Sequence, residues 1–106
     1  MALGEFEQIL LLALLQMGGR GHGVPIRLEI AGRTGRDVSA GAVYTAMERL
    51  QRRGLISSVL GDSSARRGGK RPRVYQIEPA GLEEIHRSVR TLGRMTEGLT
   101  VSPETS

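Results

Sequence analysis

Basic side chains concentrate in one stretch of the sequence, and groups of this kind bind anions. From position 49 to position 73 the chain carries eight basic residues and one acid, Asp62. These 25 residues hold a formal charge of +7, whereas the whole chain of 106 residues holds +4. Duplex DNA carries a negative charge about every 1.7 Å along its axis. The charge asymmetry therefore indicates a polyanionic partner. The basic residues are Arg49, Arg52, Arg53, Arg66, Arg67, Lys70, Arg71 and Arg73.

Residue types that support catalysis or metal binding are scarce. The chain has no Cys, which excludes disulfides, thiolate zinc sites and cysteine nucleophiles. Only His22 and His86 offer imidazoles, so a metal site would depend on carboxylates. Glu83 and Glu84 are adjacent and point in different directions on a helix, which makes them a poor acid–base pair. The sequence therefore predicts that the protein is not an enzyme and has no metal and no cofactor.

The elements that must position the basic residues follow from the spacing of the apolar residues. Apolar residues three and four positions apart predict four helices. Two short stretches rich in β-branched residues predict a pair of strands joined by a glycine-rich loop. The predicted helices span residues 4–18, 22–33, 39–53 and 79–99, and the predicted strands span residues 55–60 and 73–77.

Three helices, a hairpin and a final helix are the element order of a winged helix-turn-helix. The expected fold class is α+β, mostly α with a small β-hairpin. In that architecture the third helix enters a major groove and the hairpin is the wing. Residues 1–78 are expected to form the DNA-binding domain, 79–99 a dimerisation helix, and 100–106 a disordered tail.

The third predicted helix offers a slim surface to DNA. Ser39 is a favourable N-cap, and the small residues after it allow the helix to sit deep in a groove. Thr45 can donate to a base edge or pack its methyl group on thymine, and Arg49 can reach guanine or phosphate. Tyr44 either contacts phosphate or props the wing as a half-buried ring. The expected DNA contacts are Ser39, Gly41, Ala42, Tyr44, Thr45, Arg49, Arg66, Arg67, Lys70, Arg71 and Arg73.

Apolar residues on the first and last predicted helices exceed what one small domain needs. The last helix carries a heptad-like apolar pattern, which is typical of helices that pair. The first helix is apolar on most sides and must be covered on most sides, so a second subunit is expected to supply part of the cover. The expected dimer contacts are Phe6, Leu10, Leu82, Ile85, Val89, Leu92 and Leu99.

The chain carries no signal for a membrane. Its longest apolar run, residues 9–15, is far shorter than the roughly 20 residues that a membrane-spanning helix needs. Glu5 and Glu7 stand where a signal peptide would carry positive charge. The expected location is cytoplasmic, in association with the nucleoid. Three scattered aromatic residues argue against single-stranded nucleic acid, whose binders stack bases on rings.

Several segments resemble PadR-like transcriptional regulators, and the resemblance covers roughly residues 3–90. It implies a dimeric repressor whose terminal helices pair the subunits and whose recognition helices meet successive major grooves. Tyr44, the outer face of the third helix and the wing cations then look like DNA contacts, and the single final helix looks like the short subfamily. Relatives often bind a small-molecule effector, which is unknown for this chain. The matching segments are Gly4–Gln8, His22-Gly23, Ser39–Tyr44, Arg49-Leu50, Gly54–Ile56, Tyr75–Ile77 and Pro79–Gly81.

The sequence thus predicts a sequence-specific regulator of transcription that binds double-stranded DNA. It is expected to act as a repressor, as a homodimer on a pseudo-palindromic operator. Two alternatives stay open: a winged-helix module that binds an acidic protein surface, and a winged helix that binds RNA.

Overall fold

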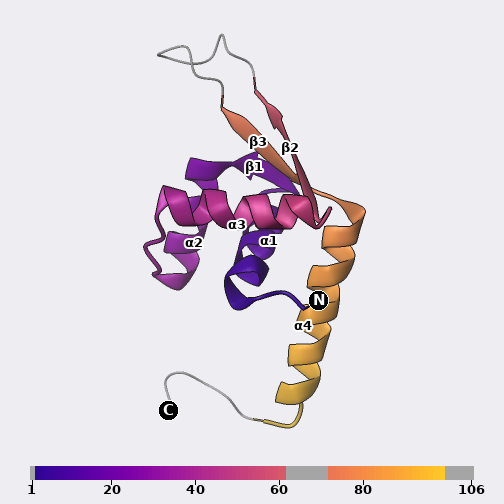
Figure 1. Cartoon of the computed structure of the whole chain (residues 1–106). Helices are drawn as coiled ribbons and strands as arrows, with labels where there is room; N and C mark the ends of the chain where they lie inside the picture. Colours follow the sequence, from indigo (N-terminus) through magenta and orange to yellow (C-terminus); the bar gives the residue numbers. More distant parts are fainter. Residues whose placement is uncertain (1, 62–71, 100–106) are drawn as a thin grey trace.

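The computed structural model of the chain describes residues 2–61 and 72–99, and it has the predicted winged-helix arrangement (Figure 1). The predicted tail at 100–106 and the central part of the wing lie outside the described residues. The helices and strands begin and end within about two or three residues of the predicted positions. The elements are α1 (Glu5–Gln16), β1 (Arg20–His22), α2 (Gly23–Thr34), α3 (Ala40–Arg52), β2 (Ile56–Leu60), β3 (Arg73–Ile77) and α4 (Pro79–Thr96).

The sheet has one strand more than the predicted hairpin. Its order is β1-β3-β2 and both pairings are antiparallel, so β3 is the central strand. Tyr75 lies at the centre of the register, opposite Gly21 on one side and Ser58 on the other. The sequence did not indicate β1, because this strand is three residues long and contains no β-branched residue. Pairing with β3, rather than local propensity, specifies it.

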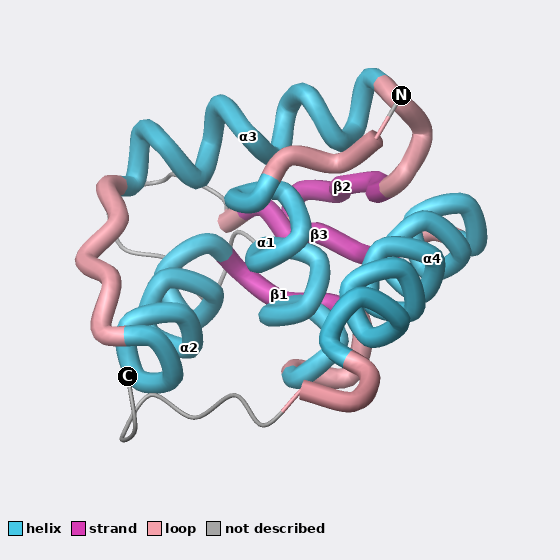
Figure 2. Tube along the Cα trace, turned by 90° about the horizontal axis from the view of Figure 1, so that it is seen from below, coloured by secondary structure: helices cyan, strands magenta, loops and turns pink. Residues whose placement is uncertain are grey.

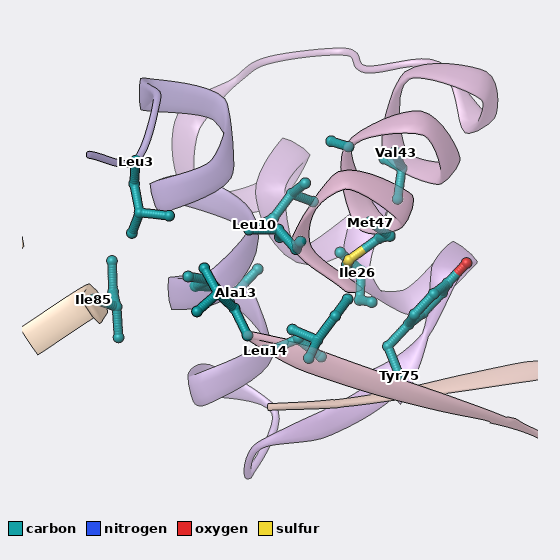
Figure 3. Close-up of a cluster of buried hydrophobic side chains, with 14 of the residues drawn as sticks. Leu3, Leu10, Ala13, Leu14, Ile26, Val43, Met47, Tyr75 and Ile85 are labelled. Atoms are coloured by element: carbon teal, nitrogen blue, oxygen red, sulfur yellow. The ribbon is translucent and has the colours of Figure 1, made fainter. Parts of the chain in front are cut away.

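Helix α1 lies at the centre of the molecule, surrounded by α2, α3 and α4 (Figure 2). Its side chains Leu10, Leu11 and Leu14 are fully buried. Met47 of α3 and Tyr75 of β3 converge on the same cluster (Figure 3). Burying each such leucine stabilises the fold by about 1.5–3 kcal/mol. Most of the apolar side chains of the first helix are therefore buried within one protomer.

Among the described residues, α4 is buried against the domain through its first turns. Gly81 and Ile85 are its buried residues, and Ile85 lies near Leu3 at the edge of the core (Figure 3). Leu10 and Ile85 have no exposed surface, so they are not available to a second copy, contrary to the prediction. The spacing of the apolar residues correctly predicted that Leu10 and Ile85 are buried. It could not show whether the same protomer or a second copy buries them. No helix in the described ranges combines the length and apolarity needed to cross a membrane.

Candidate nucleic-acid interface

Helix α3 lies across the outside of the domain, with the β2–β3 hairpin rising beside it (Figure 1). Its inner side is buried through Val43, Ala46, Met47 and Leu50. Successive residues are about 100° apart around a helix, so the buried residues determine which residues lie on the opposite side and point outward. That outward line consists of four exposed residues, Gly41, Thr45, Glu48 and Arg52.

The start of α3 is slim and well capped. The Ser39 hydroxyl oxygen accepts a hydrogen bond of 3.0 Å from the backbone N–H of Ala42, which confirms the predicted N-cap. Gly41 and Ala42 are exposed, and no atom lies within 4 Å of a Cβ placed on Gly41. A groove wall can therefore approach the backbone of this turn closely. Free amides at a helix N-terminus also favour phosphate.

Tyr44 lies on the flank of α3 that faces the sheet, and its side chain is 51% exposed. Its hydroxyl group donates a hydrogen bond of 3.2 Å to Oε2 of Glu48. Tyr44 thus orients an acid on the outward line of α3.

Tyr75 of β3 lies buried near this flank of α3. Its burial raises the pKa of its phenol above the usual value, while the Arg73 guanidinium acts in the opposite direction.

A chain of polar contacts fixes the base of the wing against α3. Nη1 of Arg73 on β3 donates to Oγ of Ser58 at 2.9 Å. The same hydroxyl donates to Oε1 of Gln51 on α3 at 2.8 Å. Arg73, a predicted contact, is therefore held beside α3 by a strand residue and a helix residue.

The other flank of α3 faces an acid from α1. Glu7 lies with one carboxylate oxygen 3.7 Å from Nε of Arg49 and the other 4.0 Å from Nη1 of Arg53. Its side chain is only 13% exposed, and its Oε1 also accepts the backbone N–H of Gly4 at 2.8 Å. Arg49, a predicted contact, is thus partly neutralised by a residue 42 positions away in the sequence.

The structure brings together all seven of the predicted DNA contacts that lie in the described residues. Ser39, Gly41, Ala42, Tyr44, Thr45 and Arg49 share the exposed sides of α3, and Arg73 lies beside them on β3. The four loop cations Arg66, Arg67, Lys70 and Arg71 lie outside the described residues.

Two residues of the outward line, Glu48 and Arg52, were missing from the predicted set. Helical spacing alone could have found them, because they follow Gly41 and Thr45 at intervals of three and four.

The predicted dimer contacts divide by exposure. Leu82, Val89 and Leu92 are exposed along α4, and Leu99 is exposed just after the helix ends. Met95 of α4 is more exposed than any of them, at 74%. Phe6 is partly buried against the core.

Comparison with known proteins agrees with this geometry. The PadR-like family of transcriptional regulators matches residues 11–87. A comparison with curated proteins finds no match. Among solved structures, a PadR family transcriptional regulator from Eggerthella lenta is 22% identical, with 90% of this chain and 82% of that chain covered and a TM-score of 0.70. A PadR-like transcriptional regulator from Bacillus cereus is 24% identical, with 86% and 84% covered and a TM-score of 0.69.

A further solved structure is F93 from STIV, a winged-helix DNA-binding protein. It is 19% identical, with 86% of this chain and 90% of that chain covered and a TM-score of 0.71. At these identities the structural likeness establishes the winged-helix fold. The match over residues 11–87 establishes the family. The chain therefore belongs to the PadR-like family of transcriptional regulators, and it is a DNA-binding regulator rather than an enzyme.

Proposed function

We propose that the protein is a homodimeric repressor that binds a pseudo-palindromic operator through α3 and the wing. Residues 1–78 would bind DNA and residues 79–99 would pair the subunits. The observation that carries the proposal is the outward line of α3, which is slim at its N-terminal end, is exposed throughout, ends in Arg52 and lies beside Arg73. A major groove about 12 Å wide admits such a helix.

The wing complements α3 in this arrangement. The contacts from Arg73 through Ser58 to Gln51 fix the base of the wing next to α3. From that base the sequence continues into Arg66, Arg67, Lys70 and Arg71. Cations of this kind contact phosphates or enter the minor groove, where they add affinity and set the register.

The apolar side of α4 supports pairing of two copies. Val89, Leu92 and Met95 are exposed on α4, and Leu99, just beyond the end of the helix, is exposed as well. A groove of about 410 Å³ between α1 and α4, lined in part by Leu12 and Val89, continues that surface. A second copy would cover these residues and stabilise the complex by the hydrophobic effect.

Such pairing would also explain the form of the operator. A two-fold dimer would set its two recognition helices about one turn of DNA apart, roughly 34–36 Å, so its operator would be pseudo-palindromic. The repressor role rests on the family resemblance.

Binding to a duplex at several salt concentrations tests the proposal. Each cation that contacts phosphate contributes close to one unit to the slope of log affinity against log salt. Replacing Arg66 and Arg67 with Ala should therefore flatten the slope by about 2. The matched control replaces Arg87 and Arg94 with Ala, since both lie on the side of α4 away from Val89 and their loss removes the same charge. The control should keep the slope of the unmodified protein.

Absence of duplex binding would contradict the proposal. Preference for structured RNA over duplex DNA would favour the RNA-binding alternative. Capture of an acidic protein that survives nuclease treatment, with no duplex shift, would favour the protein-interaction alternative.

A further inference from the structure

Glu48 is the one acid of α3, and it stands in the middle of the surface proposed to face DNA. It lies on the outward line between Thr45 and Arg52 and is exposed. A shallow hollow of about 230 Å³ opens beside it, lined by Glu48, Gln51 and Arg52. The hollow is large enough to receive a polar group from a partner. An acid at this place must have a favourable partner in the complex, because phosphates repel it.

The edges of the bases differ in what they offer a carboxylate in the major groove. Cytosine presents the N4 amino group, which donates a hydrogen bond. Guanine and thymine present acceptors, which repel a carboxylate, and adenine places the N7 acceptor next to its amino group. A carboxylate in the groove therefore favours cytosine over the other three bases.

The carboxylate of Glu48 is already oriented in the protein. The Tyr44 hydroxyl donates to Oε2 at 3.2 Å from one turn earlier on the helix. In the described part of the chain, no other hydrogen bond to this carboxylate is found. Oε1 therefore keeps its capacity to accept a hydrogen bond from outside. Orientation before binding reduces the entropy lost when a contact forms.

We propose that Glu48 is a specificity-determining residue that selects cytosine in each half of the operator, with Tyr44 as its positioning residue. The inference rests on the proposed entry of α3 into the major groove. Arg52 and Arg73 offset the repulsion between Glu48 and the backbone of the duplex. The acid thus lowers general affinity for DNA and raises discrimination among sequences.

Selection of bound duplexes from a random library tests the inference, with the unmodified protein and Glu48→Gln compared side by side. The unmodified protein should select one position per half-site that is cytosine. Glu48→Gln should change that position to adenine, because a Gln amide pairs with adenine N6 and N7. It should leave the other selected positions unchanged. Operators that differ at this base should differ in affinity by about tenfold in opposite directions for the two proteins.

Three further variants separate reading of a base from a general effect of charge. Glu83→Gln makes the same chemical change on the exposed surface of α4 and should select the operator of the unmodified protein. Tyr44→Phe should weaken the preference at the cytosine position alone. Glu48→Ala should lose that preference and bind random duplexes more tightly. Circular dichroism of each variant verifies that the fold is kept.

The outcomes distinguish this inference from the proposed function. If the unmodified protein selects a duplex and Glu48→Gln selects the same bases at every position, the role of Glu48 is wrong and duplex binding stands. If the unmodified protein selects no duplex, the proposed function fails and the inference fails with it.

Discussion

Gly81 shows how a single residue joins α4 to the winged domain. The residue is buried, and a Cβ at this position would overlap the backbone carbonyl oxygen of Leu55. The backbone N–H of Glu78 donates to the same carbonyl group at 2.9 Å. The start of α4 therefore lies directly against the backbone that precedes β2. Only a residue without a side chain permits that approach.

Gly81→Ala should therefore lower the free energy of unfolding by about 1–3 kcal/mol, since the backbone must move to relieve the overlap. Denaturation in urea measures the change. The matched control is Gly93→Ala on the same helix, where no atom lies within 4 Å of the added Cβ. The control should leave the protein equally stable or more stable by about 0.5–1 kcal/mol, because Ala favours helix. Equal losses in both variants would contradict the close approach at residue 81.

At the scale of single residues, the sequence predicted roles that depend on local geometry. The Ser39 cap was predictable because its partner, Ala42, is three residues away. The outward line of α3 was also predictable from helical spacing, although Glu48 and Arg52 were missed. The contact between Arg49 and Glu7 was not predictable, because it depends on how α1 packs against α3.

At the scale of elements, Glu7 links the core helix α1 to the recognition helix α3. Its carboxylate faces Arg49 and Arg53 and also caps the start of α1. It therefore limits the positive charge that α3 presents to DNA.

Glu7→Gln should steepen the salt dependence of duplex binding, by up to about one unit of slope, since it removes a charge that competes with phosphate for Arg49. It should also raise affinity for random duplexes. An amide oxygen can still accept the Gly4 N–H, so the cap of α1 is retained. Salt titrations of the variant and the unmodified protein measure the change.

The effect of Glu7→Gln should shrink in an Arg49→Ala background, because the freed group is then missing. Thermal unfolding checks that the fold is unchanged. A variant that loses stability but keeps the original salt slope would contradict the electrostatic role and leave only a structural one.

The order of the elements was predictable, while the sheet and the destinations of apolar faces were not. Periodicity of three and four positions predicted all four helices, and β-branched runs predicted β2 and β3. Strand β1 forms because β3 offers it a free edge, which no local pattern reports. A local pattern also does not show which element covers an apolar residue. For this reason Leu10 and Ile85 were predicted to contact a second copy, although they are buried within the protomer.

At the scale of the whole molecule, the second half of α4 extends beyond the domain with its apolar side uncovered (Figure 1). Leu92→Glu should therefore disrupt the proposed dimer, because a charge would be buried without a partner. Light scattering during size exclusion should give the monomer mass, and affinity for a two-half-site duplex should fall.

The control for this variant is Leu28→Glu, which replaces an equally large and exposed leucine on α2. It should remain a dimer. A Leu92→Glu protein that keeps the dimer mass would contradict pairing through α4.

The central claim is that the outward line of α3 enters the groove of duplex DNA, and Gly41→Glu tests it most directly. The position is exposed with no atom within 4 Å of an added Cβ, and an acid in the first turn of a helix is favourable. The variant should keep or gain stability and lose at least about 100-fold in affinity for the selected operator, through repulsion and steric exclusion. Gly32→Glu, the same change at an exposed and open position of α2, should retain most of the affinity. Full operator affinity in a folded Gly41→Glu protein would contradict the account.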